Sequence, residues 1–229
     1  MRLVLEPPVR DDGRKTILFI DDIFDSNEHP ALKPVKGMLD KEYCCLTAHR
    51  NRRPDSTVML VRAFCIGEYR PDLIVAYGSG ATIAAQIKGL DKVLVKPYYG
   101  TSGVLKDMLG AKKEKVRVEL PNFEKPEYLT IAPPMVQGYK HLEINAFQNG
   151  YNNGAHALFF APDIDTPAYQ VQIKHFGTAL TVPGESLYDP EGIESVAKFI
   201  RNVMELKKDE VRPDDDGFCL DEASLEGWL

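Results

Sequence analysis

The stretch that decides the fold reads Leu73-Ile74-Val75-Ala76-Tyr77-Gly78-Ser79-Gly80-Ala81-Thr82-Ile83-Ala84-Ala85-Gln86-Ile87. Its first part is an apolar run rich in β-branched residues, which is typical of a buried strand. Its last part has the composition of an amphipathic helix. Small residues (Ala76, Gly78 and Gly80) occupy the turn between them. The sequence therefore predicts a strand, a sharp elbow and a helix, in that order.

The centre of this elbow is the position where an enzyme would carry a nucleophile. A strand–turn–helix of this type strains its central backbone, so small residues must flank the centre two positions before and after. Ala76 and Gly80 meet that requirement when Gly78 is central. Centring on Ser79 would place the bulky Tyr77 where a small residue is needed. The nucleophile position therefore falls on a residue without a side chain.

Short apolar strands alternate with helical segments over most of the chain. This pattern predicts an α/β fold with a mainly parallel sheet. The expected strands cover residues 16–20, 43–48, 73–76, 92–95, 157–161 and 179–182. Helices are expected at 56–68 and from about 190 to 207, and Asp189 is the expected N-cap of the second.

Proline marks an insertion between the fourth and fifth of these strands. Pro121, Pro126, Pro133 and Pro134 predict that no long element forms between about 111 and 153. In an α/β enzyme this place suits a cap or lid. We therefore divide the chain into an N-terminal extension (1–15), one domain (16–208) with this irregular cap-like insertion, and an acidic C-terminal tail (209–229).

Composition narrows the function classes. The 229-residue chain is 44% hydrophobic, enough for one core, and its net charge of −6 argues against nucleic-acid binding. The opening residues lack the apolar core of a signal peptide, and no run is long enough to cross a bilayer. The four cysteines have no CxxC spacing. We expect a cytoplasmic protein with reduced thiols and no membrane association.

Several motifs in order resemble one family. Residues Pro71–Ala81, followed by Val93-Leu94-Val95-Lys96-Pro97, are similar to the small α/β-hydrolase-like esterases of bacteria, the YqiA-like group. That family reads P-D-L-I-I-G-x-S-x-G-G at the elbow, and its next strand ends in an N-P pair. The similarity extends from Thr16 to about Met204. It implies an α/β-hydrolase-like three-layer sandwich and esterase-type chemistry.

The resemblance also assigns the functional positions. The family's nucleophile falls on Gly78, its acid on Asp163 (with Asp165 as a near substitute), and its histidine on Glu185. Its oxyanion loop falls on Ile20–Phe24, with Asp22 in place of a glycine. A serine hydrolase needs a hydroxyl, a base with a pKa near 7 and oxyanion donors. Glu185 is ordinarily too weak a base, and a carboxylate at 22 would repel the oxyanion.

Two functions follow as alternatives. The first is a catalytically silent protein that binds a small acyl or anionic ligand, or a protein partner. The second is an active serine esterase with Ser79 as a displaced nucleophile, served by Asp163 and Glu185. A helix cap or a small turn residue is the structural interpretation of Ser79. The predicted ligand-binding residues are Asp21, Asp22, Ile23, Tyr77, Gly78, Ser79 and Gly80.

No cofactor and no metal are predicted. Asp21, Asp22 and Asp25 follow the first strand, and turn chemistry explains them better than a Mg²⁺ or Ca²⁺ site, which is the minor alternative. None of the five histidines has metal-ligand spacing. His156 would face the pocket only if the loop before it folds inward.

The tail (209–229) combines eight acidic side chains with large apolar ones. One interpretation is a solvated, disordered tail. The other is a docking segment for the domain, a second subunit or another protein. The apolar residues that favour docking are Phe218, Leu220, Leu225, Trp228 and Leu229.

Overall fold

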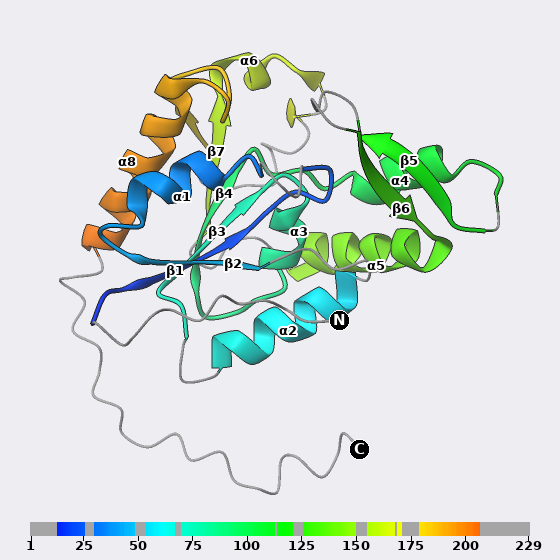
Figure 1. Ribbon diagram of the computed structural model, residues 1–229, viewed down its shortest axis with the longest axis horizontal. Coiled ribbons are helices and arrows are strands. Elements are labelled where there is room, and N and C mark those ends of the chain that lie inside the picture. The colour runs from blue at the N-terminus through cyan, green and yellow to red at the C-terminus, as the bar shows by residue number, and fades with distance from the viewer. Residues whose placement is uncertain are drawn as a thin grey trace, which may run out of the picture.

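The computed structural model contains a central parallel sheet between two layers of helices (Figure 1). It describes residues 13–25, 30–48, 54–66, 70–112, 114–120, 126–149, 155–167, 169–170 and 179–206. The sheet strands are β1 (Thr16–Ile20), β2 (Cys44–Ala48), β3 (Leu73–Tyr77), β4 (Asp91–Val95), β7 (Ala155–Phe160) and β8 (Ala179–Val182). Their spatial order is β2-β1-β3-β4-β7-β8, and every pairing is parallel. The predicted three-layer α/β sandwich is confirmed.

The helices fall on both faces of this sheet. They are α1 (Lys33–Leu39), α2 (Pro54–Ile66), α3 (Gly80–Ala84), α4 (Thr101–Leu109), α5 (Pro133–Asn149), α6 (Ala161–Ile164) and α8 (Pro190–Leu206). Helices α2, α3 and α5 pack on one face, and α1 and α8 on the other. Within the described residues, no helix is both long enough and apolar enough to cross a membrane.

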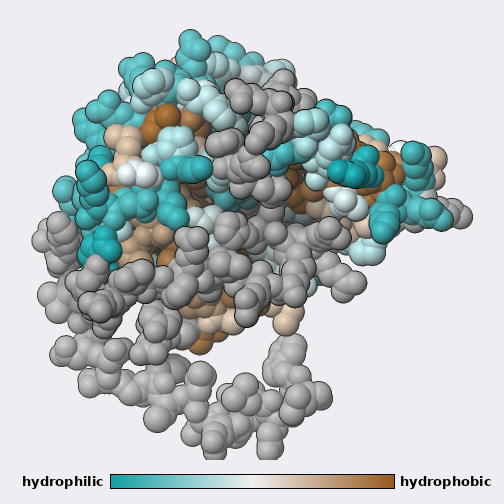
Figure 2. Space-filling model, viewed as in Figure 1, coloured by the Kyte–Doolittle hydropathy of each residue, from teal (hydrophilic) through white to brown (hydrophobic). Residues whose placement is uncertain are grey.

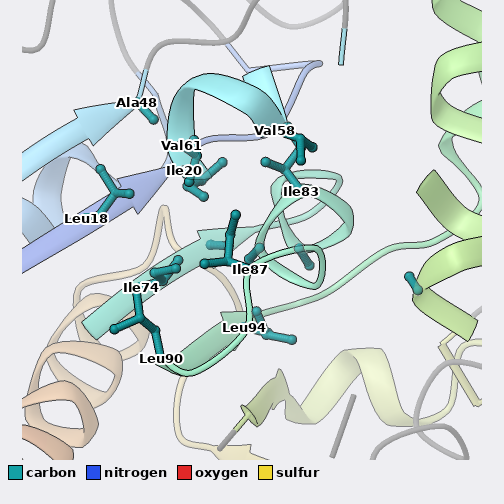
Figure 3. Packing of buried hydrophobic residues seen from close by; sticks show 14 of the residues in the cluster. Leu18, Ile20, Ala48, Val58, Val61, Ile74, Ile83, Ile87, Leu90 and Leu94 are labelled. Atoms are coloured by element: carbon teal, nitrogen blue, oxygen red, sulfur yellow. The ribbon is translucent and has the colours of Figure 1, made fainter. Parts of the chain in front are cut away.

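The alternation of side chains along β3 supplies both cores. Ile74 and Ala76 point to the α2–α3–α5 side, and Leu73 and Val75 to the α1–α8 side. Figure 3 shows Ile74 and Leu94 of the sheet among Ile83, Ile87 and the α2 side chains. A strand buried on both faces reads as a continuous apolar run, which explains why its sequence was so informative.

Helix α8 begins as the sequence predicted. The Asp189 carboxylate accepts the N–H of Gly192 at 3.2 Å, which is the side-chain bond of an N-cap.

The expectation for the insertion was wrong in one respect. Residues 111–153 contain an antiparallel hairpin, β5 (Val116–Leu120) and β6 (Glu127–Ile131), and then the 17-residue α5. Pro133 and Pro134 do not break this helix, because they occupy its first turn, where the proline nitrogen replaces N–H groups that have no intrahelical partner. The hairpin, α4 and α5 share a separate apolar cluster, which Ile23 joins from the β1 side.

The predicted N-terminal extension is described only from Gly13 to Lys15, and the acidic tail lies outside the described residues.

Candidate functional site

The elbow lies at the carboxyl edge of the sheet, between β3 and α3. Gly78 has φ +54°, in the left-handed region that glycine adopts readily. Its N–H donates to the Val95 carbonyl at 3.2 Å, and its carbonyl accepts the Tyr98 N–H at 3.1 Å. A Cβ on Gly80 would lie 2.5 Å from the Ile20 carbonyl oxygen, so this flank must be glycine. The elbow is therefore pinned against both β1 and β4.

The Asp22 side chain fills the space above Gly78. A Cβ built on Gly78 would lie 1.8 Å from Asp22 Oδ2 and 2.7 Å from its Cγ. Real atoms do not approach so closely, so no side chain at position 78 fits while Asp22 stays in place. The carboxylate occupies the place where a nucleophile on this turn would project.

Ser79 holds that carboxylate. Its Oγ donates to Asp22 Oδ1 at 2.8 Å and accepts the Ile23 N–H at 2.9 Å. The Phe24 N–H also donates to Asp22 Oδ1, at 3.0 Å. Ser79 is only 1% exposed. The side-chain helix cap considered for Ser79 is wrong, because its hydroxyl joins the β1 loop to the elbow instead.

The same contacts change the loop that would supply an oxyanion donor. The Ile23 N–H is directed at Ser79 Oγ, and the Ile23 side chain is buried in the cluster of the insertion. Of the predicted ligand-binding residues, Ile23, Gly78, Ser79 and Gly80 are buried. Asp21, Asp22 and Tyr77 keep partial exposure.

Asp163 is a buried acid in α6, three residues after the end of β7. It is 4% exposed, and its Oδ1 lies 2.6 Å from Lys96 Nζ. Its Oδ2 accepts the Phe160 N–H at 3.2 Å. A buried carboxylate must be paired, and here a lysine pairs it. Asp165, the near substitute, is exposed at the end of α6.

Lys96 is a site residue that sequence reasoning missed. Its backbone φ is +46°, which is unusual for a residue other than glycine. Its ammonium lies 5.1 Å from the centre of the Tyr169 ring. Its side chain is 26% exposed. The only signal was its place in the family's N-P pair, where Lys96 replaces the asparagine.

Glu185 lies apart from these groups. Its side chain is exposed, and its N–H donates to Asp189 Oδ2 at 3.1 Å at the start of α8. In the described part of the chain, no hydrogen bond or ion pair joins Glu185 to Asp163 or Ser79.

The charge around the elbow is negative. Burial raises the pKa of the Tyr77 hydroxyl, and Asp22 and Asp25 raise it further. Burial, then Asp163 and Asp22, raise the pKa of Tyr169. Both phenols therefore stay neutral donors at physiological pH.

The acids of the first loop show no metal arrangement. Asp25 Oδ2 accepts the Ala31 N–H at 3.1 Å, which fits turn chemistry. No group of three His, Cys, Asp or Glu that could hold a metal occurs among the described residues. His156 stacks edge-on against Phe199 of α8, with ring centres 5.6 Å apart.

Comparisons with known proteins identify the fold. No family model and no curated protein matches the chain. A putative hydrolase from Agrobacterium vitis S4 is similar in structure, with a TM-score of 0.61 at 12% identity over 84% of this chain and 88% of that one. Est1E from Butyrivibrio proteoclasticus gives 0.60 at 13% identity, over 88% and 91%. The esterase domain of a Rhodothermus marinus protein gives 0.58 at 11%, over 86% and 88%.

These likenesses show the α/β-hydrolase fold for this chain. The narrower resemblance to the YqiA-like esterases stays a prediction.

Proposed function

We propose that this protein is a catalytically silent member of the α/β-hydrolase fold that binds a small acyl or anionic ligand at the carboxyl edge of its sheet. The observation that carries the proposal is the Asp22 carboxylate in the space above Gly78. A serine hydrolase needs a hydroxyl at that point and donors for the charge that develops there. Here the point holds a fixed negative charge.

The other two triad positions support the same conclusion. The Asp163 carboxylate is engaged by Lys96 and the Phe160 N–H, so its charge is paired with a lysine ammonium and not with a catalytic base. The Glu185 side chain is exposed, and within the described residues it has no hydrogen bond or ion pair with Asp163 or Ser79. Within the described residues, each of the three positions therefore lacks its catalytic partner.

Lys96 determines where an anionic group would bind. Asp22 repels an anion placed directly over Gly78. The Lys96 ammonium is paired with Asp163, but it is partly exposed and has three N–H donors, so it still offers a hydrogen-bond donor to an anion further along the same edge. Tyr77 and Tyr169 offer aromatic surface beside it. A carboxylate with an acyl chain matches this combination. A protein partner presenting such a group is the alternative occupant.

The displaced-serine esterase is the competing hypothesis. Ser79 would have to leave Asp22 and Ile23 and reach substrate from a position that is 1% exposed. An adjacent carboxylate is a poor base at neutral pH.

Hydrolysis assays separate the two hypotheses. The purified protein is tested for turnover of short p-nitrophenyl esters and for labelling by a fluorophosphonate probe. We expect neither, in folded protein and in its Ser79→Ala variant alike. Turnover or labelling that Ser79→Ala abolishes would overturn the silent assignment.

Ligand binding is tested with octanoate by NMR titration. We expect saturable shifts near Lys96 that disappear in the double variant Lys96→Met/Asp163→Asn, which removes the cation and leaves no unpaired buried charge. Equal binding by the double variant would exclude Lys96 as the anchor.

We also propose a cytoplasmic location, supported by the reduced thiols of Cys45 and Cys65.

A further inference from the structure

Helix α2 presents apolar side chains to solvent as well as to the core. Its inner side buries Val58, Val61 and Cys65. On its outer side Met59 is 70% exposed and Ile66 75%. These two residues are seven positions apart, so they share one face of the helix. Figure 2 shows brown, hydrophobic surface in this region, at the lower edge of the described part.

The residues between them continue the same face. Arg62 and Ala63 follow Met59 by three and four positions, the spacing that brings helical side chains together, and both are exposed. Leu60, which is 39% exposed, borders the face. We call these five residues (Met59, Leu60, Arg62, Ala63 and Ile66) the α2 surface. It is apolar except for one guanidinium at its centre.

A second arginine lies just beyond the helix. Arg70 is exposed and donates to the Gly89 carbonyl at 2.8 Å, and Arg62 donates to the Gln86 carbonyl at 3.0 Å. Main-chain carbonyls leave a guanidinium charge in place, whereas a carboxylate would neutralise it. Arg62 and Arg70 thus add positive charge to this apolar side of the domain.

The C-terminal tail has the complementary composition. Residues 209–229 hold eight acidic side chains and one basic one. Phe218, Leu225 and Trp228 are interspersed with them. A segment that is acidic and apolar matches a surface that is cationic and apolar, in charge and in hydrophobicity.

The last described helix, α8, ends at an edge of the sheet from which the tail can reach the α2 surface. Lys15 Nζ donates to the Met204 carbonyl at 3.4 Å, which places the last turn of α8 beside the start of β1 (Figure 1). The Thr16 N–H donates to Asp72 Oδ2 at 2.8 Å, so β3 starts at the same edge. Helix α2 ends at Ile66, shortly before Asp72. The residues from 207 to 229 extend over as much as roughly 75 Å, ample to pass from that edge to α2.

We infer that the tail of this chain docks on its own α2 surface. The apolar side chains of the tail cover Met59 and Ile66, and its carboxylates pair with Arg62 and Arg70. The contact is intramolecular, because the tail begins at the edge of the domain where α2 ends.

The chain's one tryptophan makes the inference measurable. Trp228 lies in the tail, so tryptophan emission reports on the tail alone. In the full-length protein we expect blue-shifted emission and acrylamide quenching several-fold weaker than in a peptide of residues 209–229. The double variant Met59→Glu/Ile66→Glu should restore the quenching of the free peptide. Met38→Glu is the matched control, since Met38 is also exposed (38%) but lies on α1, on the other face of the sheet.

Three outcomes would overturn the inference. Peptide-like quenching in the full-length protein would show that the tail is not docked. Protection that survives Met59→Glu/Ile66→Glu, in protein with an unchanged circular dichroism spectrum, would place the tail on another surface. Protection that is lost on dilution would assign the contact to a second copy of the chain or another partner.

Discussion

Replacing Gly78 by alanine tests the central feature of the site. The new Cβ would lie 1.8 Å from Asp22 Oδ2, so the carboxylate must move. Overpacking a close-packed position costs about 1–3 kcal/mol. The left-handed φ of +54° adds a backbone cost for a side chain of about 1–2 kcal/mol. We expect Gly78→Ala to lower the free energy of unfolding by about 2–5 kcal/mol.

A double-mutant cycle separates the two contributions. In an Asp22→Ala background the clash with the carboxylate is removed and only the Cβ at position 22 stays close, at 3.2 Å, so Gly78→Ala should cost little more than the backbone contribution of about 1–2 kcal/mol. The coupling between positions 22 and 78 is then about 1–3 kcal/mol. Gly89→Ala is the control for backbone cost, because Gly89 has φ +70° and its Cβ would meet nothing closer than 4.0 Å.

Urea unfolding, followed by circular dichroism, gives these free energies for the wild type, the two single variants, the double variant and the Gly89→Ala control. Additive costs in the two backgrounds would refute the reasoning, since they would mean that Asp22 does not fill the space above Gly78.

Three further changes have defined outcomes. Lys96→Met leaves the Asp163 carboxylate buried without its cation and should cost about 2–4 kcal/mol in urea unfolding, less than a fully buried pair because Lys96 is partly exposed. Adding Asp163→Asn should recover most of that loss, and no recovery would contradict the pairing. Asp189→Ala removes the N-cap of α8 and should cost about 1 kcal/mol, whereas an unchanged unfolding midpoint would show that the cap contributes nothing. Burial raises the pKa of Glu143, whose carboxylate accepts the Ser102 N–H at the start of α4. The pKa of Glu143 is higher in the folded state than in the unfolded state, so protonation favours folding. The free energy of unfolding of the wild type should therefore rise relative to that of Glu143→Gln as pH falls from 7 through the raised pKa. A difference between the two proteins that does not change with pH would refute this.

The fold was readable from sequence because its strands are buried on both faces. Such strands appear as short apolar runs, and β1, which is buried in all but its first residue, coincides with its predicted range; β8 also coincides, although it is partly exposed. The prediction for the insertion was wrong because the effect of proline depends on its position in a helix. Proline breaks a helix when it lies in the interior, but it is favoured in the first turn. Nothing in the local pattern around Pro133 distinguishes the two cases.

Only part of the candidate site could be predicted from the sequence. Gly78 was located by the small residues that flank it and Asp163 by the family resemblance, and both lie at the carboxyl edge of the sheet. The direction of the Asp22 side chain and its pairing with Ser79 depend on residues 57 positions apart, which no local pattern encodes. The Lys96–Asp163 pair is likewise a tertiary contact. Sequence therefore located the positions, and the contacts that decide their chemistry required the fold.

Those contacts make the absence of a side chain at position 78 a property of two loops. A serine at position 78 and a carboxylate at position 22 exclude each other, because the space for the serine Cβ is already filled. The carboxylate does not swing aside freely, since the Ser79 hydroxyl and the Phe24 N–H both donate to it. Gly78→Ser should therefore destabilise the protein without producing an esterase. A serine nucleophile at position 78 requires a change at Asp22 as well, together with another partner for the Ser79 hydroxyl and an Ile23 N–H that is free to donate to an oxyanion.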